Sequence, residues 1–178
     1  MHAQKRLLIV IIIVGGIAVL GSYILGALTV PDAGQILWGG VPQGLRPFIT
    51  MNMFLAAAGY FAFTYFILFR LDPVETQVTS RFGFGLFNAL YAAILIPSAL
   101  WLPLTFLAVE QSSPAFEWAA KLDLGIVAIA SLGLFVALLK VKPSSPLWAH
   151  RMALVGCVFF CIQTVIFDAL IWGFFFRL

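Results

Sequence analysis

Five long apolar runs constrain this chain more than any other feature of its sequence. Four of the runs contain no Asp, Glu, Lys or Arg, and the fifth contains only Asp168. A helix needs about 20 apolar residues to cross the hydrocarbon of a bilayer, so each run predicts a transmembrane helix. We expect helices over residues 7–30, 47–69, 82–109, 118–139 and 149–176.

The composition supports this interpretation. Of the 178 residues, 63% are hydrophobic and only 10% are charged, whereas soluble domains carry about 25% charged residues. The length allows five spans with short connections and leaves no room for a separate soluble domain. The expected fold class is therefore all-α, an integral membrane bundle of five transmembrane helices forming one domain over residues 1–178. The first run is too long for a cleaved signal peptide, so we expect an uncleaved anchor.

The positive charges predict an orientation. With the N-terminus in the cytoplasm, the inner side collects Lys5, Arg6, Arg70, Arg81, Lys140, Lys142 and Arg151, and the outer side holds Arg46, Lys121 and Arg177. This bias predicts a cytoplasmic N-terminus and a C-terminus outside, with the lipid bilayer as the first partner. The charges form no basic patch, so nucleic acid is not an expected partner. The first outer loop, around Trp38, is rich in Gly and Pro and is either a lid over the bundle or a plain linker.

Polar residues in the third run share one helix face. They are Asn88, Tyr91, Ser98 and Thr105, with Trp101 beside them. Pro97 and Pro103 in the same span free backbone carbonyl groups that need other partners. Two interpretations stay open, namely interhelical hydrogen bonding with a kink, or a cavity lined by polar groups.

In the first run, the small residues Ala18, Ser22 and Gly26 predict a ridge for close helix packing.

The fifth run carries a second polar stripe that includes an ionisable residue. Its members are Cys157, Cys161, Thr164, Asp168 and Trp172. Asp168 precedes Arg177 by about 13 Å of helix, well inside the hydrocarbon. A charged group there costs roughly 2.5 to 3.5 kcal/mol, which makes Asp168 a candidate functional residue. The alternative is a structural role, in which a protonated or paired carboxyl group of Asp168 links two helices, with Asn52, Thr105 or Trp101 as its partner.

Catalytic chemistry finds no support in the residues. The histidines, His2 and His150, lie too far from Asp168 for a catalytic triad, and no cluster has the spacing of a metal site. Glu110, Glu117 and Asp123 are most simply a solvated rim at the outer surface. We therefore expect no enzyme, no metal and no resident cofactor.

Three short motifs resemble a known family. They are Trp101-Leu-Pro103-Leu-Thr-Phe106 in the third helix, Ala119 to Asp123 at the start of the fourth, and Asp168-Ala-Leu-Ile-Trp172 in the fifth. Together with the long first loop, they resemble the translocator protein or tryptophan-rich sensory protein family, whose motifs are W-x-P-L-x-F, A-x-x-D and N-x-x-x-W. The sequence departs from that family at Ser98 and Asp168, where the family has asparagine, and in the first loop, where Trp38 to Pro47 echo W-x-P-P only loosely.

The resemblance implies a pocket beneath the first loop that binds tetrapyrroles or sterol-like lipids, often in a homodimer. It implies that Trp38, Trp101, Asp168 and Trp172 line this pocket. The carboxylate of Asp168 would prefer a cationic or hydrogen-bond-donating group to the carboxylates of a porphyrin.

The two polar stripes and the deep tryptophans lead to one functional hypothesis. We expect a membrane-embedded protein that binds a flat apolar molecule in the outer half of the bundle, with Asp168 as the polar anchor. The expected ligand-binding residues are Trp38, Asn52, Ser98, Trp101, Thr105, Thr164, Asp168 and Trp172. The alternatives are a structural or assembly subunit of a larger membrane complex and, last, a proton-coupled transporter that uses Asp168.

Overall fold

The computed structural model describes residues 2–141 and 147–178, and it has the expected all-α architecture. Five helices are long and apolar enough to cross a membrane: α1 (Ala3–Thr29), α3 (Arg46–Arg70), α4 (Gly85–Gln111), α5 (Pro114–Lys140) and a last helix, Leu147–Phe175. The last helix consists of α6 (Leu147–Cys161), the π-helix η1 (Ile162–Trp172) and α7 (Gly173–Phe175). The prediction of an integral membrane bundle of five helices is confirmed. Lys142, which entered the charge count, lies outside the described residues.

The helix boundaries differ from the predicted ones by a few residues. α5 begins at Pro114 rather than near residue 118, because Pro114 occupies the first turn, where a missing backbone N–H is tolerated. α4 begins at Gly85 rather than 82, after a tight turn in which the backbone N–H of Val78 donates to Phe82 O at 2.9 Å. A short helix that the sequence did not predict, α2 (Ala33–Trp38), lies in the first loop.

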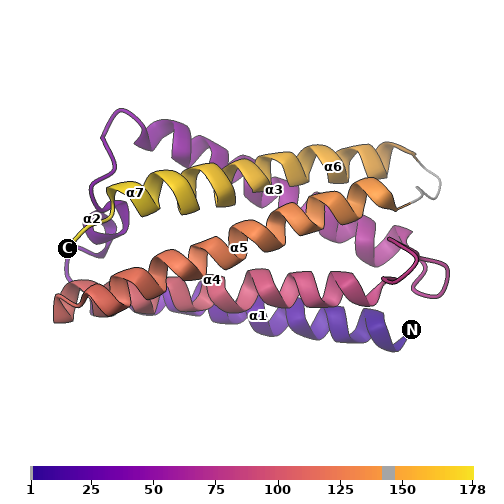
Figure 1. The fold of residues 1–178 in the computed structure, drawn as a ribbon, viewed down its shortest axis with the longest axis horizontal. Coiled ribbons are helices and arrows are strands. Elements are labelled where there is room, and N and C mark those ends of the chain that lie inside the picture. Colours follow the sequence, from indigo (N-terminus) through magenta and orange to yellow (C-terminus); the bar gives the residue numbers. More distant parts are fainter. Residues whose placement is uncertain (1, 142–146) are drawn as a thin grey trace.

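The five long helices form an open ring. α1 packs on α4, α4 on α5, α5 on the last helix, and the last helix on α3. Figure 1 shows α1 alongside α4 and α6 alongside α3, with the two chain termini at opposite ends of the bundle. The ring is open because α1 and α3, which stand at its two ends, have no extensive contact with each other.

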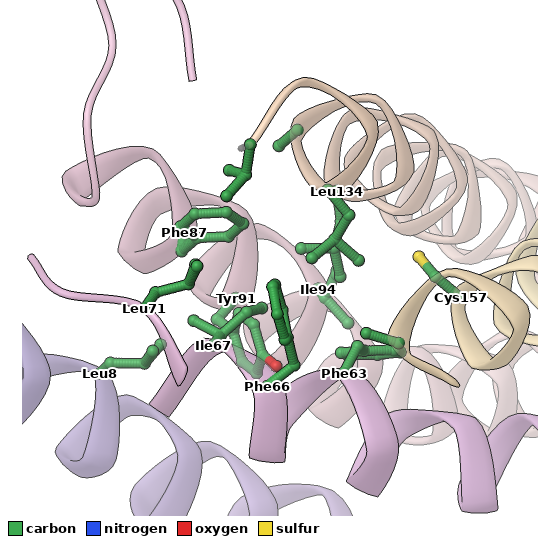
Figure 2. Packing of buried hydrophobic residues seen from close by; sticks show 14 of the residues in the cluster. Leu8, Phe63, Phe66, Ile67, Leu71, Phe87, Tyr91, Ile94, Leu134 and Cys157 are labelled. Carbon is green, nitrogen blue, oxygen red and sulfur yellow. The ribbon is translucent and has the colours of Figure 1, made fainter. Parts of the chain in front are cut away.

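At the end of the bundle where the N-terminus lies, a tightly packed core fills the space between the helices. Leu8 of α1 joins the same buried cluster as Phe63, Phe66 and Ile67 of α3, and all four side chains are fully buried. Figure 2 shows these residues converging with Phe87, Tyr91 and Leu134 from α4 and α5. The Tyr91 hydroxyl also lies 2.7 Å from Thr64 Oγ1, a hydrogen bond between α4 and α3. We call this half of the bundle the closed end.

The predicted ridge of small residues in α1 is only partly correct. Gly26 is buried, but Ala18 is exposed. The close approach to α4 uses Gly26, beside Phe106, together with Gly15, where an added Cβ would lie 2.7 Å from Leu95 Cβ. The spacing of four residues therefore paired Gly26 with Ala18, whereas the second residue of α1 that closely approaches α4 is Gly15.

Candidate ligand-binding cavity

A cavity of about 720 Å³ occupies the other half of the bundle, toward the C-terminus. Its walls come from α1, α3, α4, α5 and the last helix, and α2 covers one end. The cavity adjoins the closed end. Ile94 belongs to the core of the closed end and Tyr60 packs against that core, and both residues also line the cavity. Its volume falls within the range of sites that hold small organic molecules.

The carboxyl group on the cavity wall belongs to Asp168, and two linked side-chain amides, those of Gln163 and Asn52, hold it in place. Gln163 Nε2 donates to Asp168 Oδ1 at 2.8 Å, and Asn52 Nδ2 of α3 donates to Gln163 Oε1 at 3.0 Å. Asn52 Nδ2 also donates to Phe159 O at 3.2 Å, which fixes the direction of the chain. We call Asn52, Gln163 and Asp168 the amide relay.

The π-helix explains why Gln163 reaches Asp168. Residues five apart lie about 140° apart around an α-helix, on different faces. In a π-helix each turn is wider and hydrogen bonds join residues five apart, so Gln163 and Asp168 come onto one side. Sequence reasoning missed Gln163 because it assumed α-helical spacing, which places Gln163 off the stripe that contains Asp168.

No basic side chain among the described residues forms an ion pair with Asp168. Among residues 2–141 and 147–178, the one ion pair joins Lys121 to Glu117, and Gln163 is the only hydrogen-bond donor to Asp168. Tyr23 of α1 lines the same cavity as Asp168. The carboxyl group therefore faces an apolar space with a neutral partner on one oxygen.

Aromatic rings from three helices line the same cavity as this carboxyl group. The rings of Trp101 and Trp172 meet edge to face with centroids 5.2 Å apart, and Tyr23 lies 6.3 Å from Trp101. Trp172 also stacks on Phe176 at 4.4 Å, which locks the indole in place. All three cavity-lining rings come from different helices, so they form a corner that can receive a flat molecule.

The first loop forms a roof over the cavity, as the lid interpretation expected. Trp172 Nε1 donates to Leu37 O at 2.8 Å, which ties the roof to the last helix. Arg46 Nε donates to Val41 O at 3.2 Å while its guanidinium lies over the Trp38 ring at 5.3 Å. Leu37, Trp38 and Val41 all line the cavity.

The cavity opens sideways, through the gap between α1 and α3. Leu20 of α1 and Phe61 of α3 both line the cavity, yet they are 65% and 71% exposed on the outside of the bundle. Met53, which lies about two α-helical turns closer to the roof than Phe61, is 45% exposed in the same gap. In a membrane this opening faces lipid rather than water.

Six of the eight predicted ligand-binding residues line the cavity. They are Trp38, Ser98, Trp101, Thr164, Asp168 and Trp172. Asn52 does not line it but belongs to the amide relay. Thr105 is fully buried away from the cavity, where its hydroxyl donates to Trp101 O in its own helix.

Hydrogen bonding between helices, one of the two interpretations left open for α4, does not hold for two of its hydroxyl groups. Ser98 Oγ donates to Ile94 O at 2.7 Å and Thr105 Oγ1 to Trp101 O at 2.8 Å, both within α4. A serine or threonine in a helix can satisfy its hydroxyl on the carbonyl group four residues earlier, and this local bond wins here. The partners proposed for Asp168, which were Asn52, Thr105 and Trp101, do not bond to it directly.

The predicted solvated rim is also wrong at one position. Glu110 is exposed and Glu117 pairs with Lys121 at 2.5 Å, but Asp123 is buried. Its Oδ2 has no hydrogen-bond partner among the described residues. The reason is helical phase, because Asp123 shares the inward face of α5 with Ala120, Leu124 and Val127.

The cysteine pair lies apart from the cavity. Cys157 is buried in the core of the closed end, and Cys161 Sγ donates to Ser131 O at 3.4 Å. These two members of the fifth-helix stripe therefore serve packing, while Thr164, Asp168 and Trp172 reach the cavity.

No family model, curated protein or solved structure matches this chain. Its resemblance to the translocator protein family thus remains a proposal that depends on the motifs themselves.

Proposed function

We propose that this chain is a membrane-embedded binding protein that holds a flat apolar molecule in the cavity, with Asp168 as the polar anchor. One observation carries the proposal. A cavity of about 720 Å³ brings together aromatic residues from several helices around a single carboxyl group. Binding sites for small molecules are typically apolar clefts with a few polar groups that fix orientation. Tetrapyrroles and sterol-like lipids are the ligand classes that the resemblance to the translocator protein family implies.

The first experiment titrates the purified protein with protoporphyrin and a panel of sterols and follows quenching of tryptophan fluorescence. Trp101 and Trp172 line the cavity, so an occupied cavity quenches them. We expect saturable quenching at micromolar concentration that weakens in Asp168→Ala. A folded protein that shows no saturable signal with any of these compounds contradicts the proposal.

Two glycines of α1 provide a matched test that leaves the polar groups intact. A Cβ added at Gly16 or at Gly21 meets no atom within 4 Å, so the first carbon of a side chain has open space at both positions. Only Gly16 lines the cavity. We expect Gly16→Phe to fill the cavity and abolish binding, and Gly21→Phe to bind as the wild type does. Equal binding by the two variants would place the ligand elsewhere.

The proposal includes an orientation with the N-terminus in the cytoplasm and the C-terminus outside. The distribution of Lys and Arg supports it. In this orientation the roof and the cavity lie in the outer half of the membrane. Reporter fusions to each end, one active only in the cytoplasm and one only outside, test the assignment.

A second candidate function, an assembly subunit of a larger membrane complex, is favoured by one observation. The apolar surface of α1 is left largely uncovered, with Ile17 and Leu28 68% and 78% exposed. A partner helix could cover this surface as lipid does. Co-purification of a stoichiometric partner in mild detergent, together with loss of assembly but not of ligand binding in Ile17→Asn, would favour this function over the first.

A further inference from the structure

The surroundings of Asp168 narrow the chemistry of the ligand, and the following inference depends on the proposed function. Asp168 has a neutral amide donor on one oxygen and no basic partner among the described residues. A carboxyl group in an apolar setting is costly to ionise without a positive charge nearby. A ligand that carries an ammonium group would offset this cost, and the described part of the chain supplies no such cation to Asp168.

The aromatic residues of the cavity favour the same charge. The Trp101 ring lies 6.3 Å from Tyr23 and 5.2 Å from Trp172 between ring centroids, and all three rings line the cavity that Asp168 lines. The faces of tryptophan and tyrosine rings attract ammonium groups, and the attraction increases when water is excluded. A carboxylate flanked by such rings accepts an ammonium group better than it accepts a neutral or anionic group.

The amide relay makes this anchor directional. Asn52 donates to Gln163 Oε1, so the amide of Gln163 must present its N–H groups to Asp168. This arrangement occupies Oδ1 of Asp168, and no described residue donates to Oδ2. Asn52 does not line the cavity, so Oδ2 of Asp168 is the carboxylate oxygen available to a ligand there.

The opening between α1 and α3 determines how such a ligand arrives. Leu20 and Phe61 border an opening that faces lipid, while the roof is tied down by the bond from Trp172 to Leu37. The ligand must therefore dissolve in the bilayer before it enters. This requirement selects an amphiphile, in which a compact basic group is attached to a large apolar body.

We propose that the cavity binds a lipophilic amine, which enters from the membrane between α1 and α3 and places its ammonium group against Asp168 Oδ2. The charges balance in either starting state. An ammonium ion meets an ionised Asp168 directly, and a neutral amine takes the proton of a protonated Asp168, leaving the same ammonium–carboxylate pair. The aromatic corner covers the cation and the apolar walls hold the body of the molecule.

The test compares two probes that differ in this one group, 1-pyrenemethylamine and 1-pyrenemethanol. Both are flat and apolar, and pyrene accepts energy from excited tryptophan. The full-length protein is placed in nanodiscs of phosphatidylcholine, and empty nanodiscs correct for partition into lipid. We expect the amine to bind at least about tenfold more tightly than the alcohol, which corresponds to about 1.4 kcal/mol.

The variant Asp168→Asn isolates the charge, because it keeps the shape of the side chain. We expect the preference for the amine to disappear in this variant while the alcohol binds as before. If Asp168→Asn does not assemble, the comparison of the two probes on the wild type decides by itself, and N-acetyl-1-pyrenemethylamine gives a second uncharged control.

The outcomes separate the two proposals. Equal affinity of the wild type for the amine and the alcohol overturns the inference but leaves the proposed function intact, since a flat apolar molecule still binds. Saturable binding of protoporphyrin or a sterol without any binding of the amine also overturns the inference and leaves the proposed function intact. Absence of binding by every compound, in a protein that remains folded, overturns both.

Discussion

Gly59 of α3 and Gly156 of α6 meet backbone to backbone, so closely that a Cβ added to Gly156 would lie 2.6 Å from Gly59 Cα. No real Cβ atom approaches another carbon this closely. Glycine at both positions is therefore what allows the last helix to pack on α3, one of the two most extensive helix contacts in the bundle. Small residues at helix contacts serve this purpose in membranes, where burial alone gives little driving force between helices.

This contact gives the first prediction. Gly156→Ala forces a methyl group against the backbone of α3, and we expect it to lower the free energy of unfolding by about 1–3 kcal/mol. Gly125→Ala is the matched control, because an added Cβ there meets no atom within 4 Å. Reversible unfolding in mixed micelles measures both variants. Similar values for the two variants would contradict the close contact.

The second prediction concerns packing at the closed end. Leu8 is fully buried and its neighbour Leu7 is 52% exposed. Leu8→Ala leaves a cavity where α1 meets the core, and we expect a loss of about 2–5 kcal/mol. We expect Leu7→Ala to change the free energy of unfolding by less than about 0.5 kcal/mol. The same unfolding measurement in micelles tests this pair, and a larger effect at Leu7 would mean that α1 is rotated about its axis.

The third prediction concerns the amide relay. Asn52→Leu and Gln163→Leu each leave a polar partner without its hydrogen bond, which costs about 1–3 kcal/mol. Because the two residues share a bond, we expect the double variant to lose less than the sum of the single losses, by about 0.5–3 kcal/mol.

A control cycle pairs Asn52→Leu with Ser131→Ala. Ser131 Oγ donates to Val127 O in its own helix and shares no partner with Asn52. We expect additive effects there within about 0.5 kcal/mol. Additivity in the Asn52 and Gln163 cycle would show that the relay does not form.

The fourth prediction concerns the roof. Trp172→Phe removes the donor to Leu37 O but keeps an aromatic ring that can stack on Phe176. We expect faster amide hydrogen exchange over 33–45 and a loss of about 0.5–1.5 kcal/mol. Trp118→Phe, at a side chain that is 63% exposed on α5, is the control and leaves exchange in that segment unchanged. Unchanged exchange in Trp172→Phe would mean that other contacts hold the roof.

The fold was predictable because the membrane imposes a simple rule on the sequence. A span must be apolar over about 20 residues, so the charge-free runs located all five long helices to within a few residues. Helix ends were less accurate, since they depend on local features such as Pro114 rather than on hydropathy. α2 escaped prediction because six residues in a loop rich in glycine carry no periodic signal.

The candidate site was only partly predictable, for a geometric reason. The assumption of α-helical spacing placed Thr164, Asp168 and Trp172 on one inward stripe, and all three do line the cavity. The same assumption hid Gln163, which comes to Asp168 only through the wider turns of η1. The assumption also did not say which face of α5 points toward the other helices. Asp123 was therefore assigned to the surface, although the structure buries it.

The bond between Trp172 and Leu37 joins positions 135 residues apart. A ribosome releases the first loop long before it makes the last helix, and membrane insertion follows the same order. The cavity therefore cannot be roofed in any nascent chain that lacks its final span. Under the proposed function, a ligand that needs the roof can bind only after synthesis has passed Trp172, so ligand binding would report that assembly is complete.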